Sequence, residues 1–118
     1  MNLFKIIIMA CICIIAAFGT PAFPAEMPAE KALLIDVRTE QEWNQGHLEG
    51  AILIPYETIG AAIEKVAPDR KAKIYLYCRS GRRSGIALDA LKKLGYENVS
   101  NEGSLQSASE TLHIPVVK

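Results

Sequence analysis

One cysteine in this chain is followed at once by a basic, glycine-containing segment, a combination that can support nucleophilic chemistry. In the stretch "IYLYCRSGRRSG", Ile74 to Gly85, a run of strand-forming residues ends in Cys78. Three of the five arginines in the 118-residue chain follow within five positions: Arg79, Arg82 and Arg83. A thiol attacks as the thiolate, and nearby cations or a helix N-terminus lower its pKa below about 8.5. The segment therefore predicts a reactive Cys78 beside a binding site for an anion.

The residues after the cysteine are those that a tight anion-binding loop requires. Gly81 allows a backbone conformation that a side chain would oppose, and successive backbone amides in such a loop converge on one point. Guanidinium groups bind oxyanions through planar donors, although Arg83, in the first helical turn, could brace the loop instead. Serine hydroxyls could donate hydrogen bonds to the sulfur, or Ser84 could only cap the helix. The predicted substrate-binding residues are Arg79, Ser80, Gly81, Arg82, Arg83 and Ser84.

A second polar group follows an earlier apolar run. Asp36 and Arg38 end the stretch "ALLIDV" and should reach the same edge of the sheet as Cys78. We expect a buried ion pair between them, with Glu42 or Arg83 as a further partner. Its role is structural support rather than catalysis, because no step of thiol chemistry needs these residues. His47 is expected to fix a loop rather than to act as a base.

The elements that position these residues alternate between strand and helix. Short apolar runs predict strands at 32–37, 51–55, 73–77 and 96–100, and polar or amphipathic segments predict helices at 39–46, 58–67 and 83–94. Thr39 and Glu42 have the spacing of a capping box, and Trp43 should pack its helix onto the sheet. Beyond residue 100 we expect a turn at Gly103 and a short helix. Alternating strands and helices predict a parallel sheet covered on both faces, with ligands at the carboxyl ends of its strands.

The N-terminus has the pattern of a secretory signal peptide. Lys5 precedes thirteen uninterrupted apolar residues, 6–18, and the helix breakers Gly19, Pro21 and Pro24 follow. A bilayer-spanning helix needs about 20 apolar residues, so cleavage is favoured over a permanent membrane anchor. We predict a signal peptide at residues 1–25, with its end between 19 and 25, and one exported or periplasmic domain at residues 26–118.

Charge and cysteine content limit the function of that domain. The chain carries 13 basic and 13 acidic residues, which does not favour nucleic acid as a partner. Removal of the signal peptide takes away Cys11 and Cys13 and leaves Cys78 without a partner for an internal disulfide. A lone cysteine in an exported protein is either a buried apolar residue or a reactive thiol, and the basic loop favours the thiol. After cleavage we expect no membrane attachment, and a monomer.

Three motifs resemble one family. "CRSGRRS" resembles the active-site loop of the rhodaneses, the thiosulfate sulfurtransferases. "LIDVRTEQEWNQGHLEGAILIP", Leu34 to Pro55, resembles the N-terminal signature of the same domains, and "LKKLGYENV" resembles their segment after the active-site helix. The size and predicted export are most similar to the periplasmic phage shock protein E type. The resemblance implies a three-layer α/β fold with a central five-stranded parallel sheet flanked by helices.

The resemblance also implies a mechanism. The thiolate of Cys78 would attack the outer sulfur of thiosulfate and release sulfite, and the persulfide would pass its sulfur to cyanide or to a thiol. It implies no metal and no organic cofactor. Many rhodanese domains carry Gly-Gly and then Trp after the last strand, where this chain has "NEGSLQSA".

Two other functions stay open from the sequence. A cysteine phosphatase or arsenate reductase would use the same kind of loop, but the phosphatase motif is one residue longer than the C-x-x-x-x-R from Cys78 to Arg83. A rhodanese-like module could also carry sulfur or sense redox state without turnover, because a fold does not determine function.

Overall fold

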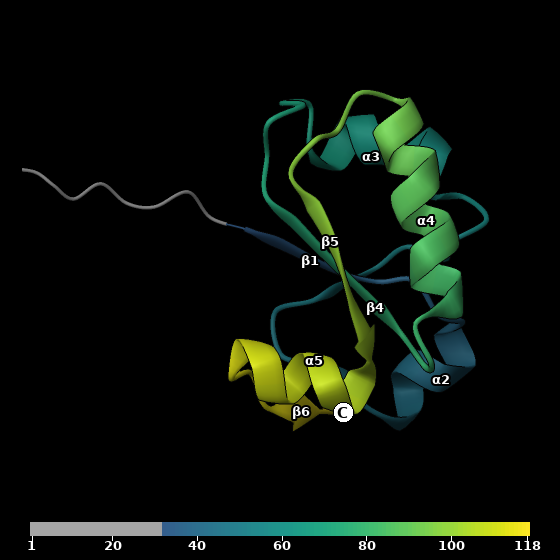
Figure 1. Ribbon diagram of the computed structural model, residues 1–118. Coiled ribbons are helices and arrows are strands. Elements are labelled where there is room, and N and C mark those ends of the chain that lie inside the picture. Colours follow the sequence, from purple (N-terminus) through teal and green to yellow (C-terminus); the bar gives the residue numbers. More distant parts are fainter. Residues whose placement is uncertain (1–31) are drawn as a thin grey trace, which may run out of the picture. The chain divides into compact units, whose positions relative to one another are not determined.

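The computed structural model describes residues 32–118, and its strands and helices alternate as predicted (Figure 1). The predicted signal peptide, residues 1–25, lies outside the described residues, as do residues 26–31. The elements run in the order β1 (Leu33–Asp36), α2 (Glu40–Gln45), β2 (His47–Leu48), β3 (Ile52–Leu53), α3 (Ile59–Val66), β4 (Ile74–Cys78), α4 (Arg82–Lys93), β5 (Val99–Ser104), α5 (Leu105–Leu112) and β6 (Val116–Val117). Within residues 32–118, no helix is both long enough and apolar enough to cross a bilayer.

The central sheet is parallel, with the strand order β3-β1-β4-β5. β1 and β4 are its inner strands, and their register pairs Asp36 with Tyr77. The carboxyl ends of these two strands therefore lie side by side, as predicted. Cys78, one residue further along β4, is opposite Ser104 of β5 after a register shift. The sheet thus brings both predicted polar groups to one edge.

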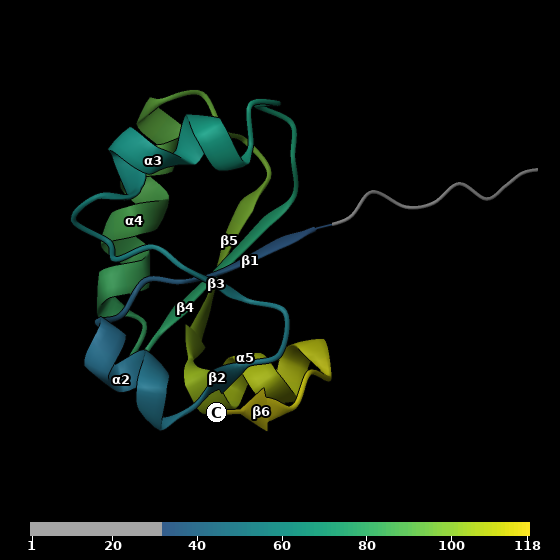
Figure 2. The same ribbon diagram turned by 180° about the vertical axis from the view of Figure 1, so that it is seen from behind.

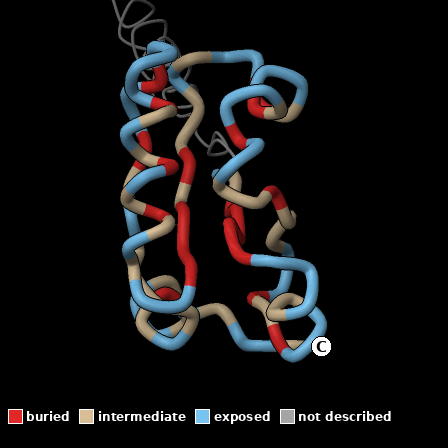
Figure 3. The backbone as a smooth tube through the Cα atoms, turned by 90° about the vertical axis from the view of Figure 1, so that its right-hand side faces the viewer, coloured by how far each residue is buried: buried red, intermediate tan, exposed pale blue. Residues whose placement is uncertain are grey.

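Helices cover the two faces of the sheet, which gives three layers (Figures 1 and 2). Alternate residues of each inner strand point to opposite faces, as the pleat requires. One face packs against α3 and α4 in a cluster that includes Ile35, Leu76 and Leu91. The other face packs against α5, where Tyr77 meets Ala108. Figure 3 shows the buried positions gathered on the inner sides of these elements.

The strand inventory differs from the expectation of five parallel strands. In the described residues the parallel sheet has four strands, and β2 and β6 form a separate antiparallel pair. His47 is opposite Val117 and Leu48 is opposite Val116, so these short segments pair with each other rather than with the edge of the main sheet. β5 covers residues 99–104 instead of 96–100, because Tyr96 turns inward and its hydroxyl donates to the carbonyl of Ala67 at 2.6 Å.

One further expectation, about the packing of Trp43, was wrong. Trp43 does not anchor its helix in the core, since α2 contains no buried residue. Its ring stacks on the imidazole of His47, with ring centroids 3.6 Å apart. The capping box is confirmed: Thr39 and Glu42 each accept a hydrogen bond from the other's backbone N–H. A six-residue helix with no buried side chain thus depends on polar contacts at its N-terminus and on ring stacking at its C-terminus.

Leu91 lies on α4, and Leu94 is the C-cap residue of the same helix. Substitutions at these two positions show how much of the free energy of unfolding comes from packing. Leu91 is fully buried between α4 and the sheet, whereas Leu94 is 39% exposed. We predict that Leu91→Ala lowers the free energy of unfolding by about 2–5 kcal/mol, because it removes contacts and leaves a cavity. Leu94→Ala should cost about 0.5 kcal/mol, as surface substitutions do. Urea unfolding followed by circular dichroism measures both, and equal losses would contradict the packing described.

Candidate active site

Cys78 occupies the position that the sequence predicted, at the carboxyl end of an inner parallel strand. It is the last residue of β4, and α4 begins four residues later at Arg82. The side chain is fully buried, whereas Arg79, Ser80 and Arg82 of the loop are exposed. Within the described residues Cys78 is a free cysteine. The sulfur therefore lies beneath a loop whose outer surface is charged and faces solvent.

The backbone of the loop turns toward the sulfur. Gly81 has φ 98°, in the left-handed region, and its N–H donates to the Sγ of Cys78 at 2.9 Å. A Cβ at this position would lie 3.4 Å from the Cα of Gly103, so the loop also passes close to β5. The left-handed backbone is what requires glycine here, because glycine adopts a positive φ without strain.

The surroundings of the sulfur favour its ionised form. Burial raises the pKa of the Cys78 thiol, but hydrogen bonding by the Ser84 side chain and backbone, and by the backbone of Gly81 and Ser80, outweighs it. The pKa of Cys78 therefore lies below its ordinary value. This agrees with the expectation that converging amides stabilise a thiolate. Hydrogen-bond donors of the loop thus favour the nucleophilic thiolate without a histidine base.

The three loop arginines divide into two kinds. Arg83 forms a two-pronged ion pair with Glu42 of α2, with N···O distances of 2.9 and 3.0 Å. This contact is the main reason that the pKa of Glu42 falls to about 2. Arg79 and Arg82 are exposed, and neither guanidinium has a hydrogen bond or ion pair within residues 32–118. Arg83 is thus placed to brace the loop, while the other two are available to an anion.

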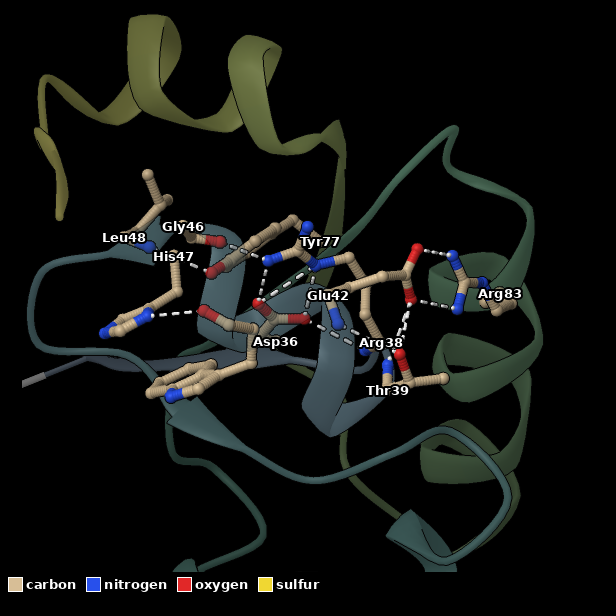
Figure 4. A network of polar contacts seen from close by, with 10 residues as sticks. Asp36, Arg38, Thr39, Glu42, Gly46, His47, Leu48, Tyr77 and Arg83 are labelled. Atoms are coloured by element: carbon tan, nitrogen blue, oxygen red, sulfur yellow. Dashed lines mark hydrogen bonds and ion pairs between the residues drawn. The ribbon is translucent and has the colours of Figure 1, made fainter. Parts of the chain in front are cut away.

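The second polar group is a buried ion pair, as predicted. Arg38 donates to the carboxylate of Asp36 through Nε at 2.9 Å and Nη2 at 2.8 Å, and both residues are buried (Figure 4). Neither Glu42 nor Arg83 joins it by hydrogen bond or ion pair, because those two residues bind each other. Arg38 instead reaches the carbonyl of Gly46 at 2.7 Å. The pair ties the end of β1 to the segment that follows α2 and has no contact with the sulfur.

Two residues near this pair complete the link to β2. The hydroxyl of Tyr77 accepts a hydrogen bond from the backbone N–H of Leu48 at 3.0 Å, and burial raises the pKa of this tyrosine. The Nδ1 of His47 lies 3.0 Å from the carbonyl of Trp43, which agrees with the expected role in fixing a loop. These contacts hold α2, and with it Glu42, in reach of Arg83 (Figure 4).

Sequence reasoning missed Asn101, which lies in β5 against the loop. Its Nδ2 donates to the carbonyl of Gly81 at 3.0 Å, and its Oδ1 accepts from the Ser84 hydroxyl at 2.6 Å and from the Gly103 N–H at 2.9 Å. Ser84 was predicted as a donor to the sulfur or as a cap, and its Oγ lies 3.5 Å from Sγ and 3.2 Å from the carbonyl of Gly81. The tail was only weakly patterned in sequence: the expected short helix is α5, whereas Gly103, expected in a turn, lies within β5.

A hollow of about 330 Å³ lies elsewhere, on the surface formed by α5 and Val116. None of the residues that line it belongs to the loop, so it is no route to Cys78. Because Cys78 is fully covered, a reagent must pass the loop itself.

A family comparison agrees with this geometry. The protein-family model for the rhodanese-like domain matches residues 22–107. The chain belongs to the rhodanese family. Membership confirms the resemblance seen in the loop and in the N-terminal signature, and with it the three-layer α/β fold. The prediction of a sulfurtransferase is confirmed at the level of the family.

Comparisons with individual proteins agree with this family assignment. The chain is 37% identical over 89 residues to the thiosulfate sulfurtransferase PspE of Escherichia coli K12, a match that covers 75% of this chain and 80% of that protein. A solved structure described as a rhodanese with anions from E. coli has a TM-score of 0.68 and 35% identity, covering 75% of this chain and 99% of the other. The putative sulfur carrier protein YrkF of Bacillus subtilis is 34% identical over 83 residues, 68% of this chain and 43% of its own length.

The ion pair between Glu42 and Arg83 should make stability depend on pH in the acid range. The pKa of Glu42 is lowered from 4.5 to about 2 on folding, so its contribution is complete above 4.5 and is lost as the pH falls toward 2. We predict that Glu42→Gln removes this part of the acid-induced loss, so that its unfolding free energy changes less than that of the wild type over the same interval.

Urea unfolding at a series of pH values measures the effect. Glu40→Gln is the matched control, because Glu40 lies on the same helix and is exposed. Its pH dependence should follow that of the wild type. If Glu42→Gln also followed the wild type throughout, the ion pair would contribute nothing to folding.

Proposed function

We propose that the protein moves the sulfane sulfur of thiosulfate, through a persulfide on Cys78, to cyanide or to a thiol acceptor. The observation that carries this proposal is the Sγ of Cys78 beneath the Gly81 N–H, at 2.9 Å, at the start of a helix in a chain of the rhodanese family. A sulfurtransferase role follows from the family and from relatives such as PspE. The identity of the donor and of the acceptor is the proposal.

In the first half-reaction the thiolate of Cys78 attacks the outer sulfur of thiosulfate. The electron pair of the thiolate forms the new S–S bond, and the S–S bond of thiosulfate breaks with its electron pair on the departing sulfite. The product is the persulfide of Cys78, and no outside oxidant or reductant is needed. A lowered pKa of Cys78 supports this step, because it increases the share of the thiol that is present as the nucleophilic thiolate.

In the second half-reaction the acceptor attacks the outer sulfur of the persulfide. Cyanide takes that sulfur as thiocyanate and returns the electron pair of the broken S–S bond to Cys78 as thiolate. A thiolate acceptor leaves as a persulfide in the same way. The Gly81 N–H supports both the persulfide and the thiolate of Cys78. It can donate a hydrogen bond to the negatively charged outer sulfur of the persulfide, or to the Sγ of Cys78 once that atom carries the charge again.

Arg79 and Arg82 are the proposed contacts of the thiosulfate anion. Both are exposed at the loop, and their guanidinium groups have no partner within residues 32–118. Ser80 and Gly81 contribute backbone donors, Ser84 contributes a hydroxyl, and Arg83 supports the loop through Glu42. The solved rhodanese from E. coli was described with anions, which is consistent with an anionic donor.

Experiment can distinguish two other functions from the proposed sulfur transfer. The similarity to a putative sulfur carrier favours, as second candidate, a module that holds sulfur without turnover. A phosphatase is disfavoured by the short loop from Cys78 to Arg83. The exported or periplasmic location remains a proposal that rests on the apolar run at residues 6–18.

We predict that incubation with thiosulfate adds one sulfur atom to Cys78. The tryptic peptide Ile74 to Arg79 carries this thiol alone, so its mass separates Cys78 from Cys11 and Cys13. Cys78→Ser should gain no sulfur in that peptide. Continuous release of sulfite in the presence of cyanide would distinguish an enzyme from a carrier, which would stop after one equivalent. Hydrolysis of an aryl phosphate without sulfur uptake would contradict the proposal.

We predict that Arg82→Glu raises the Michaelis constant for thiosulfate roughly tenfold, because a repulsive charge replaces an attractive one at the entrance. The turnover number with cyanide should change less, since the sulfur and its donors are intact. Lys92→Glu is the matched control, because Lys92 is an exposed cation near the far end of α4. Steady-state kinetics at low ionic strength measures both variants. An unchanged Michaelis constant for Arg82→Glu would mean that Arg82 does not meet the anion.

A further inference from the structure

The amide of Asn101 has one orientation that satisfies its neighbours. Its Nδ2 lies 3.0 Å from the carbonyl of Gly81, and its Oδ1 lies 2.9 Å from the N–H of Gly103. Turned over, the amide would set its NH₂ against the N–H of Gly103 and its oxygen against the carbonyl of Gly81. Donor would then face donor and acceptor would face acceptor. The backbone on both sides therefore fixes an oxygen toward Ser84.

The Ser84 hydroxyl has one proton and three acceptors within reach. The distances from its Oγ are 2.6 Å to the Oδ1 of Asn101, 3.2 Å to the carbonyl of Gly81 and 3.5 Å to the Sγ of Cys78. The shortest is close to the usual O–H···O length, so the proton points to Asn101 when the sulfur is a neutral thiol. Ser84 is fully buried, whereas Asn101 is exposed and reaches the hydroxyl from the surface.

Ionisation of the sulfur changes this competition. A charged acceptor binds a donor about twice as strongly as a neutral one, so the thiolate draws the hydroxyl toward itself. The serine keeps its proton and only changes the acceptor, while the thiol proton passes to solvent. The Oδ1 of Asn101 then keeps the N–H of Gly103 but loses the hydroxyl. Forming the thiolate thus breaks one short hydrogen bond.

We propose that Asn101 is a positioning residue that competes with the sulfur of Cys78 for the single proton of Ser84, while its Nδ2 holds the loop at Gly81. The use of this arrangement in sulfur transfer rests on the function proposed above. Asn101 acts by withholding a donor: it limits how strongly Ser84 stabilises the thiolate. A less stabilised thiolate is the stronger nucleophile, so the asparagine preserves reactivity in a site otherwise built to hold charge.

Other charged groups surround Cys78 and must be held constant in any test. The loop and the first turn of α4 carry Arg79, Arg82 and Arg83, the last paired with Glu42 of α2. On β5, Glu102 accepts a hydrogen bond from Ser100. None of these groups is altered in the variants below, so a comparison between two backgrounds cancels their effect.

A double-mutant cycle on Asn101 and Ser84 tests the proposal. The pKa of Cys78 is taken from the pH dependence of its alkylation by iodoacetamide in the full chain, read from the tryptic peptide Ile74 to Arg79. We expect Asn101→Ala to shift this pKa downward by about half a unit more when Ser84 is present than in the Ser84→Ala background. The part of the lost Gly81 contact that does not involve Ser84 is common to both backgrounds and cancels.

The outcomes are distinct. Equal shifts in the two backgrounds, or a larger upward shift with Ser84 present, would overturn the proposal and leave Asn101 with a structural role alone. Asn98→Ala, an exposed asparagine near the opposite end of β5, should leave the pKa unchanged. Because alkylation requires no thiosulfate, this result is independent of sulfur uptake, whose absence would instead overturn the proposed function.

Asn101→Asp is a second variant with the opposite expected effect. The carboxylate keeps an oxygen toward Ser84 and holds the hydroxyl more firmly, while it loses the donor to the Gly81 carbonyl in both backgrounds. Its direct repulsion of the thiolate is present in both backgrounds and cancels. We expect Asn101→Asp to raise the pKa of Cys78 more when Ser84 is present than in the Ser84→Ala background. This coupling has the opposite sign to the one expected for Asn101→Ala. A coupling of the same sign for both substitutions would overturn the proposal.

Discussion

The hydrogen bond from the Gly81 N–H to the sulfur of Cys78 is the contact around which this end of the molecule is built. It requires a left-handed backbone at residue 81, with φ 98°. That conformation places Gly81 against Gly103, and a Cβ on Gly103 would lie 2.8 Å from the Oγ of Ser107. Two glycines far apart in the sequence therefore allow one loop to close over one buried sulfur.

The loop is held from both sides of the sheet edge. On one side Arg83 reaches Glu42, whose helix is in turn capped by Thr39. On the other side Asn101 holds the carbonyl of Gly81 and the hydroxyl of Ser84. Each support ends in a polar group rather than in an apolar contact, because the loop itself has no apolar side chain. Its geometry is thus set by charge and hydrogen bonding, while the strands beneath it are set by packing.

The parts of the site that follow from local rules were predictable. Three features of the site depend only on residues close in sequence: a thiol at the end of an apolar run, a glycine three residues later and a capping box. The positions of Cys78, Gly81 and Thr39 could therefore be predicted from the sequence. The pair of Asp36 and Arg38 was also predictable, since both lie at the end of one strand. The fold class followed from the alternation of strands and helices.

The features that were not predicted, or were predicted wrongly, depend on contacts between residues distant in sequence. Asn101 lies in a polar edge strand, and no periodicity indicates which side chain of such a strand meets the loop. Trp43 was assigned to the core from its size, but its helix is too short to bury it, and the ring stacks on His47 instead. The four strands predicted from the apolar runs form the parallel sheet of residues 32–118, whereas β2 and β6 have two residues each, and no pattern can be read over so short a segment.

The complete burial of Cys78 also governs what its sulfur can bond to. A covalent link between two copies of the chain would need their sulfurs to come within about 2 Å of each other. Neither sulfur is exposed at all in this conformation, so two folded molecules cannot join through this residue. Cys78 is thereby protected from intermolecular crosslinking by the shape of the loop, and only a small, slender reagent can reach its sulfur.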